Sequence, residues 1–228
     1  MLKKNEFDKK IEKEIITLIG APIRSNNIQV FSNEKYADKQ EVRIYQTQSS
    51  SVIITAPSLY DIACQKVNIF KNDKRVSITQ LKDLLHLSGH RVESKTVFLF
   101  LDPDNYKESV LELKYKVLKI DNGYKKEFEE FMSECSKNDL EEGQVSLEDP
   151  VVFGCFHKNK LVGVTSYWFW GETLADIGVI VHPQHRKKGI AKALVSKLCK
   201  WGINHNKINL YRHDEINSKS KYLAEFYY

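Results

Sequence analysis

Residues 174–201 read LADIGVIVHPQHRKKGIAKALVSKLCKW, and this stretch decides which fold the sequence predicts. It begins with an apolar run typical of a buried strand, Ile177 to Val181, which ends before Pro183. A basic turn that contains Gly189 follows, and the apolar stripe after it predicts a helix over 188–204. The stripe places four side chains on one helical face: Ile190, Leu194, Leu198 and Trp201.

A glycine-containing turn between a strand and a helix can bind a phosphate group. The first-turn N–H groups of a helix have no partner within the helix, and the helix dipole adds positive potential there. Gly189 lets the backbone approach an anion without a Cβ in the way. The three cations before it, Arg186, Lys187 and Lys188, add charge. The alternative interpretation is an ordinary strand–turn–helix unit with a lysine-rich, solvated corner.

The spacing of this turn is more specific than that of a general phosphate loop. It is neither G-x-x-x-x-G-K-[ST] nor G-x-G-x-x-G, so it does not indicate a nucleoside triphosphate or dinucleotide site. It resembles the pyrophosphate-binding segment of the GNAT N-acetyltransferase superfamily, whose pattern is [Q/R]-x-x-G-x-[G/A] after a strand that ends in Val-x-Pro. The corresponding residues are Val181-His182-Pro183 and then Arg186-Lys187-Lys188-Gly189-Ile190-Ala191.

The order of predicted elements extends this resemblance over residues 113–223. A strand, a helix, a polar loop at 137–149, three strands, a helix and a strand follow one another, as in the core of that family. The resemblance implies an α/β (α+β) GNAT fold, in which helices flank a mixed, largely antiparallel sheet.

A smaller α/β domain is predicted before this one. Its elements are a helix at 7–19, strands at 28–31, 41–47 and 52–55, a helix at 57–70 and a strand at 96–101. The turn-rich, charged stretch 102–112 is the predicted boundary, which gives an N-terminal domain at 1–112 and an acetyltransferase domain at 113–228. By element order, the first domain also resembles the degenerate acetyltransferase-like halves of some two-domain family members.

Composition and charge exclude several classes of protein. Of 228 residues, 42% are hydrophobic and 29% charged, as in soluble globular proteins. The net charge of +5 is spread without blocks of one sign, so we expect no nucleic-acid partner. The N-terminus does not resemble a signal peptide, and no apolar run is long enough to span a membrane. Four cysteines without paired spacing favour reduced thiols in a cytoplasmic protein.

The resemblance implies acetyl-CoA as the acyl-donor substrate. In the family, the fourth strand parts from its neighbour, and its backbone groups pair with the pantetheine arm. The positions that match are Val179, Ile180 and Val181, and one N–H of such a strand points at the thioester oxygen. The backbone amides of residues 186–191 would hold the pyrophosphate.

Asp176 is the best candidate for the catalytic base, because many family members carry a carboxylate at this strand position. It would draw the amine proton through water and needs a raised pKa or a water relay to act near neutrality. The alternative is a sheet-face aspartate beside a lysine or arginine. Glu172 is the second candidate, although after Gly171 it could simply shape a turn.

The C-terminal region departs from the family in two ways. Asn217 and Ser220 match the start of the cofactor-contacting pattern Asn-x-x-[A/S]-x-x-x-Tyr, but Ala224 stands where the tyrosine that protonates the thiolate is expected. The two further strands that usually follow are also missing before Tyr228. The edge of the strand at 208–212 would then need a cover, either from the N-terminal domain or from a second subunit in a homodimer.

Two functions therefore remain open. The first is an acetyl-CoA-dependent N-acetyltransferase that acts on a small-molecule or peptide amine, without a metal and without a membrane or nucleic-acid partner. The second is a non-catalytic acyl-CoA-binding or interaction module with a degenerate GNAT fold. His182 and His185 are expected to be loop residues rather than zinc ligands. In the aromatic run 167–170, strand alternation lets only half of the rings face one pocket.

Overall fold

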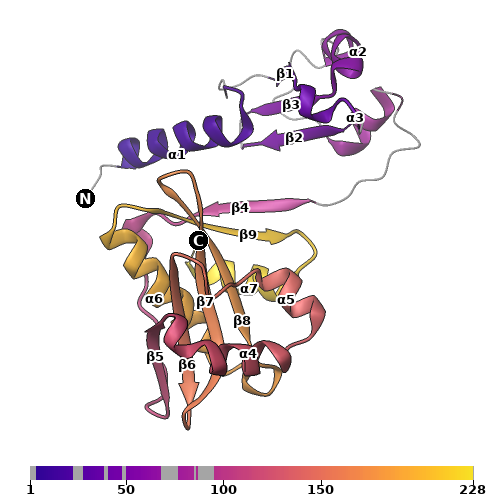
Figure 1. Ribbon diagram of the computed structural model, residues 1–228. Helices are drawn as coiled ribbons and strands as arrows, with labels where there is room; N and C mark the ends of the chain where they lie inside the picture. Colours follow the sequence, from indigo (N-terminus) through magenta and orange to yellow (C-terminus); the bar gives the residue numbers. More distant parts are fainter. Residues whose placement is uncertain are drawn as a thin grey trace. The chain divides into compact units, whose positions relative to one another are not determined.

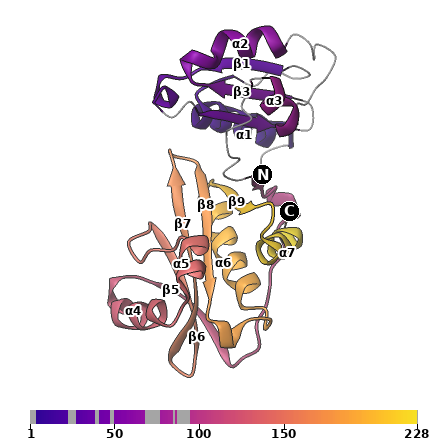
Figure 2. The same cartoon turned by 90° about the vertical axis from the view of Figure 1, so that its right-hand side faces the viewer.

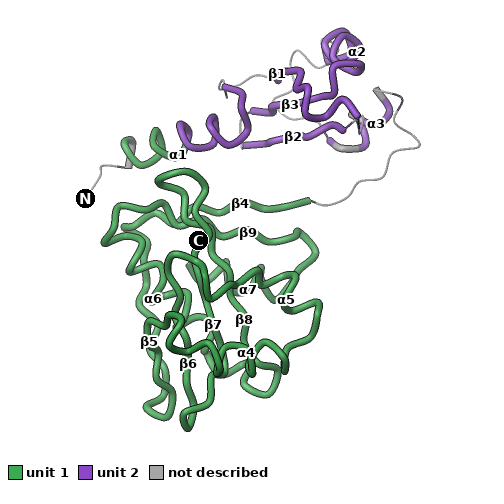
Figure 3. Tube along the Cα trace, in the orientation of Figure 1, with its two compact units in different colours: residues 1–11, 94–228 green, residues 12–93 purple. Residues whose placement is uncertain are grey.

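The structure is a computed structural model that describes residues 4–22, 28–38, 41–47, 50–67, 77–84, 86 and 95–227. Its contacts divide the chain into two compact units, a larger one of residues 1–11 and 94–228 and a smaller one of residues 12–93 (Figure 3). The predicted boundary at 102–112 lies inside the larger unit, whereas the contacts divide the chain at 93/94. The physical reason is strand β4 (Thr96–Phe100), which was expected in the N-terminal domain but pairs with a strand near the C-terminus.

The smaller unit is a three-stranded sheet with helices. Its strands are β1 (Ile28–Ser32), β2 (Val42–Gln46) and β3 (Ser51–Thr55), in the order β1-β3-β2, with β1 parallel and β2 antiparallel to β3. The central strand β3 is buried throughout. Helices α1 (Lys4–Ile19), α2 (Pro57–Val67) and α3 (Ile78–Leu84) complete the N-terminal region, together with the short 3-10 helix η1 (Glu34–Tyr36). The predicted end of the second helix, 68–70, lies outside the described residues.

The larger unit is built on a six-stranded sheet in the order β4-β9-β8-β7-β6-β5 (Figure 1). The other strands are β5 (Tyr115–Ile120), β6 (Val151–His157), β7 (Lys160–Trp170), β8 (Leu174–Val181) and β9 (Ile208–Asp214). Only the β8–β9 pair is parallel. The predicted mixed, largely antiparallel sheet is therefore confirmed.

Helices cover both faces of this sheet (Figure 2). On one face lie α4 (Lys125–Ser133) and α5 (Lys137–Gly143), and on the other lie α6 (Ile190–Asn204) and α7 (Ser218–Tyr227). Because both faces are covered, the central strands β7 and β8 are apolar almost throughout. The remaining short turns are the 3-10 helices η3 (Pro103–Asn105), η4 (Asn122–Tyr124) and η5 (Pro183–His185).

Helix α5 corrects the prediction of a polar loop at 137–149. The hydroxyl of Ser136 accepts the backbone N–H of Asp139 at 3.2 Å, so Ser136 caps the helix. Serine followed three residues later by an acidic side chain was a visible start signal. The helix has only seven residues and ends at Gly143, so the signal was not followed by a readable apolar stripe.

The edge of β9 is covered, as the sequence required. Strand β4 pairs antiparallel with it from Phe100–Leu210 to Thr96–Asp214. The cover therefore comes from the part of the chain that precedes the acetyltransferase-like segment.

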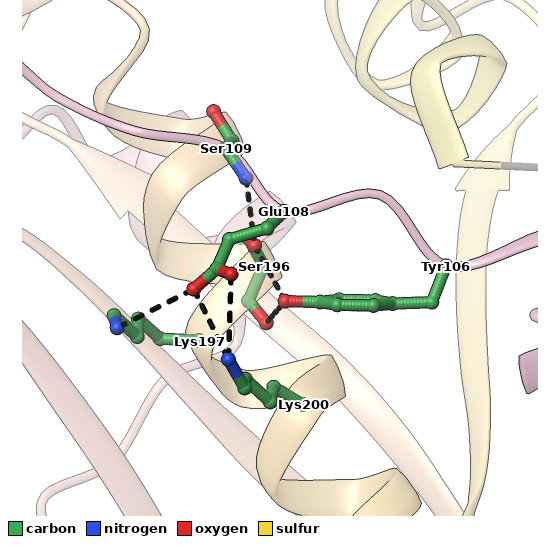
Figure 4. A network of polar contacts seen from close by, with 6 residues as sticks. All are labelled: Tyr106, Glu108, Ser109, Ser196, Lys197 and Lys200. Atoms are coloured by element: carbon green, nitrogen blue, oxygen red, sulfur yellow. Dashed lines mark hydrogen bonds and ion pairs between the residues drawn. The ribbon is translucent and has the colours of Figure 1, made fainter.

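Hydrogen bonds and an ion pair join the segment after β4 to helix α6 (Figure 4). The hydroxyls of Tyr106 and Ser196 lie 3.0 Å apart, and the Ser109 N–H donates to the same Ser196 oxygen at 3.0 Å. Glu108 adds an ion pair with Lys200 at 3.2 Å. These bonds hold the connection between β4 and β5 against the helix that begins at the glycine turn. No helix in the described part of the chain is long and apolar enough to cross a membrane.

Candidate functional site

The turn between β8 and α6 has the backbone shape that an anion site requires. Lys187 and Gly189 adopt left-handed conformations, with φ of 60° and 78°. The first intrahelical bond of α6 runs from the Ala193 N–H to the Gly189 carbonyl at 3.0 Å. Gly189, the N-cap, offers no side chain to the amides of the first turn. Those N–H groups can therefore donate to a bound anion, with the helix dipole in support.

Arg186 holds this turn in place. Its Nε donates to the Val181 carbonyl at 3.1 Å, and its Nη2 pairs with Asp139 of α5 at 2.6 Å. Burial raises the pKa of Asp139, but bonds from Ser136 and Arg186 outweigh it, and the net pKa lies below its ordinary value. The guanidinium thus connects the turn to the end of β8 and to α5.

The two lysines of the turn differ in their roles. Lys188 donates from Nζ to the Gln184 carbonyl at 2.9 Å, which closes the turn on itself. Lys187 is exposed. Of the three cations predicted to add charge, two therefore make structural bonds.

Strand β8 is paired very differently on its two sides. On the β7 side the register runs through all eight residues, from Leu174–Trp170 to Val181–Gly163. On the β9 side it holds for three residues and ends at Asp176–Leu210. We call the open stretch of β8 beyond Asp176, on its β9 side, the parting. It is the arrangement that the family resemblance predicts for the donor site.

Strand alternation shows which backbone groups face the parting. The His182 N–H bonds to a β7 carbonyl, so Ile180 and the other even-numbered residues of β8 direct both backbone groups to β7. Ile177, Val179 and Val181 direct theirs to the parting. The Val181 carbonyl is taken by the arginine of the turn. The parallel ladder ends at Asp176–Leu210, so the Ile177 N–H still pairs with the Leu210 carbonyl. Within residues 95–227, which the structure describes, the ladder leaves the Ile177 carbonyl and both backbone groups of Val179 facing the parting. The expected backbone role of Ile180 is corrected, because its groups belong to the ladder with β7.

Asp176 is the last β8 residue before the parting. Its carboxyl is buried, and Oδ2 accepts from Arg212 Nη2 at 2.5 Å, Arg212 Nε at 2.7 Å and Trp170 Nε1 at 3.1 Å. Burial raises the pKa of Asp176 above its ordinary value, while Arg212 and Trp170 act in the opposite direction. The arginine partner named in the alternative interpretation is therefore present.

Glu172 lies away from this pair. It is exposed in the turn between β7 and β8, beside Gly171 with φ of 65°, and its backbone carbonyl accepts from Lys207 Nζ at 2.5 Å. In the neighbouring aromatic run, Tyr167 is fully buried, whereas Trp168 is 62% exposed. Alternation has therefore separated core rings from exposed ones.

The end of α5 packs closely on β8 next to the parting. A Cβ at Gly178 would lie 2.5 Å from the Gly143 carbonyl oxygen and 2.9 Å from that of Gln144. Only glycine allows this approach.

The start of α7 faces the same region. Asn217 Oδ1 accepts the Ser220 N–H at 3.0 Å and so caps α7, while its Nδ2 donates to Glu142 of α5 at 3.0 Å. Ala224 is buried and lines a cavity of about 380 Å³. That cavity is bounded by Val97, Leu99, His213, Glu215, Lys221 and Glu225 as well.

Three residues at this site were missed from the sequence: Asp139, Glu142 and Tyr211. The first two belong to the unpredicted helix α5 and contact the turn and α7. Tyr211 lies on β9, one residue past the last β8–β9 pair, and its hydroxyl bonds to Ser220. Strand alternation could have indicated the face of Tyr211, but its partner lies on a helix whose position only the fold provides.

Comparison with known proteins was made by sequence and by structure. The sequence model of the acetyltransferase (GNAT) family matches residues 117–226. No curated protein matches the sequence significantly.

Several solved structures are similar. A GNAT family acetyltransferase from Colwellia psychrerythraea has a TM-score of 0.51 at 18% identity, over 76% of this chain and 70% of that one. A ribosomal-protein-alanine N-acetyltransferase from Brucella melitensis has a TM-score of 0.39 at 19% identity, over 49% and 88%. An aminoglycoside acetyltransferase from an uncultured soil metagenomic sample, in complex with sisomicin, has a TM-score of 0.40 at 17% identity, over 49% and 86%. The first likeness shows the fold, and the other two carry no argument about this chain.

Proposed function

Since residues 117–226 are a domain of the GNAT acetyltransferase family, we propose that this chain is an N-acetyltransferase that moves an acetyl group from acetyl-CoA to an amine. The observation that carries the proposal is the parting beside the glycine turn. The parting, at residues 177–181, offers strand amides and carbonyls, and the turn that follows β8 offers the N–H groups at the start of α6.

The donor is proposed to bind along both features. The carbonyl of Ile177 and both backbone groups of Val179 pair with the pantetheine arm as an added strand would. The backbone N–H groups of Lys187 to Ala191 hold the pyrophosphate. The Arg186 N–H instead donates to the Pro183 carbonyl at 3.4 Å, and the Arg186 side chain fixes the entry to the turn through the Val181 carbonyl. Asn217 and Ser220 line the far side, at the start of α7.

The chemistry is proposed to need two groups of this chain. A strand N–H at the parting polarises the thioester carbonyl, and such an oxyanion donor contributes about 3 kcal/mol to lowering the barrier. Asp176 draws the amine proton through water, and its raised pKa suits a base that works near neutrality. Glu172 is the second candidate for this role, although it lies in the exposed turn before β8.

The alternative function is a non-catalytic module that binds acyl-CoA. The observations that favour it are Ala224, which has no proton to give, and the engagement of Asp176 Oδ2 by Arg212 and Trp170. An intact donor site is expected in both cases, so donor binding does not distinguish them.

The acceptor is proposed to be a small-molecule or peptide amine. A cytoplasmic location is proposed because all four cysteines are present as thiols. Since β4 covers the edge of β9, the reason given for a homodimer no longer applies.

Two measurements test the proposal in sequence. Titration calorimetry with acetyl-CoA should detect binding, and thiol release from acetyl-CoA should then be followed across a panel of small amines and peptide N-termini. Binding with amine-dependent release supports the acetyltransferase. Binding without release from any amine supports the module, and no binding refutes both.

A further inference from the structure

Breaking a thioester leaves a thiolate, and a nearby hydroxyl can supply its proton. Strands β8 and β9 border the parting, and among their residues only Tyr211 carries a hydroxyl. It follows Leu210, the last β9 residue that pairs with β8. Tyr211 is therefore the first β9 residue alongside the parting.

The ring of Tyr211 lies on the α6 and α7 face of the sheet. It is buried in one cluster with Ile177 of β8 and Ala224 of α7, and Val179 packs against the same cluster. Two of these, Ile177 and Val179, carry the backbone groups that face the parting.

The hydroxyl of Tyr211 is held at the start of α7. A hydrogen bond joins it to Ser220, whose N–H is bonded to Asn217. The two tyrosines of helix α7 have different surroundings from Tyr211 of β9. Tyr227 donates to the Lys192 carbonyl, and Tyr222 is 66% exposed.

We propose that Tyr211 is the proton donor to the sulfur that leaves in the transfer reaction, a role that rests on the proposed function. The amine nitrogen forms a bond to the thioester carbon and loses one proton to the base. As the carbon–sulfur bond breaks, its electron pair stays on sulfur, and the Tyr211 O–H proton moves to that sulfur to give the thiol. The tyrosinate recovers a proton from water through the Ser220 hydroxyl, so the tyrosine is regenerated.

The environment of Tyr211 supports this role. Burial raises the pKa of its phenol, and the bond to Ser220 opposes that effect only in part. The side chain is therefore a neutral phenol near neutral pH and has a proton to give. A base at Asp176 and an acid at Tyr211 would lie on opposite faces of the sheet, at the same end of the parting.

The test compares Tyr211→Phe with the matched control Tyr222→Phe, using a probe that needs no turnover. Calorimetry measures the affinity for coenzyme A and for desulfo-coenzyme A, in which hydrogen replaces the thiol. The wild-type chain should prefer coenzyme A by about three- to tenfold, the value of one hydrogen bond. Tyr211→Phe should lose that preference and lower turnover by about 100-fold. Tyr222→Phe should keep both.

Each other outcome is decisive. A preference for coenzyme A that persists in Tyr211→Phe overturns the role of Tyr211, as does a wild-type chain that binds both probes equally, and both leave the proposed function intact. A wild-type chain that binds neither probe refutes the proposed function and this role with it. If a thermal melt shows that Tyr211→Phe is unfolded, a structure of the wild-type chain with coenzyme A decides. The hydroxyl should lie within hydrogen-bonding distance of the sulfur, and a clear separation overturns the proposal.

Discussion

The two sides of strand β8 differ in how far their pairing extends. Towards β7, all eight residues are paired, whereas towards β9 only three are. The same residues therefore form a closed ladder on one side and an open one on the other. The difference shows that the sequence of β8 does not determine its open side. The path of the neighbouring strand β9 does.

Strand β9 can leave β8 because β4 supports it. The β8 register covers Ile208 to Leu210, and the β4 register covers Leu210 to Asp214. The two sets meet at Leu210 and share only that residue. Beyond Leu210, Tyr211 and His213 keep their backbone bonds through β4, whereas the backbone groups of Arg212 face the parting.

The largest effect is expected at the turn that ends the open side. Gly189→Asp should abolish measurable binding of acetyl-CoA, because it places a negative charge against the pyrophosphate and a Cβ on a residue with φ of 78°. Calorimetry checks this. Gly171→Asp is the matched control, since Gly171 also has a positive φ and open space around it. Equal losses in both variants would show that folding, not the turn, is responsible.

Asp176, the last β8 residue that pairs with β9, should affect turnover. Asp176→Asn is expected to lower kcat by about 100-fold and to change KM less, because a base acts in the transition state. It should also remove the acidic limb of the pH–rate profile, where the wild-type rate rises with pH as Asp176 ionises. An unchanged profile would move the base to Glu172 or to bulk water.

Removing Arg212, the partner of Asp176, should shift the acidic limb of the pH–rate profile in a direction that can be predicted. Arg212 lowers the pKa of Asp176 against the effect of burial. Arg212→Gln removes that influence, so the pKa should rise and the acidic limb should move to higher pH. A limb that stays in place, or moves to lower pH, would show that Asp176 is not the group that titrates.

Weakening the support of β9 should loosen the open side of β8. Leu101, two residues after Leu99, donates its N–H to β9, so alternation directs the Leu99 N–H to β9 as well. Leu99→Pro should therefore remove a ladder bond and lower the free energy of unfolding by about 1–3 kcal/mol. Phe98→Pro is the control, because its N–H points away from β9. Thermal melts that fall equally in both would contradict this account of the ladder.

The smallest effect is expected at the exposed cation of the turn. Lys187→Gln should weaken acetyl-CoA binding by about two- to fivefold at low salt, and less at high salt, because exposed charges are screened. The comparison variant Lys188→Gln also removes the bond to the Gln184 carbonyl. A salt-independent loss in Lys187→Gln would mean that this side chain makes a specific contact.

Much of the larger unit followed from local patterns. The apolar runs predicted β5 to β9, and the glycine turn before an amphipathic stripe predicted α6, which begins at Ile190. Helix α5 was missed because seven residues carry too little periodicity to stand out from a polar loop. The pairing of β4 with β9 was not predicted, because a short apolar strand has no sequence feature that identifies its partner strand.

The sequence by itself determined the family, the position of the glycine turn and the residues that could carry charge to it. These depend on local spacing, since a turn and the start of a helix are formed by residues close together in the chain. Only the tertiary structure decided that β4 covers β9, that the parting begins after Asp176 and that Arg212 pairs with that carboxyl. It also placed Tyr211 beside the parting and tied Ile180 to β7. These outcomes depend on pairing between strands that are far apart in the chain, and such pairing is set by the register and packing of the whole sheet.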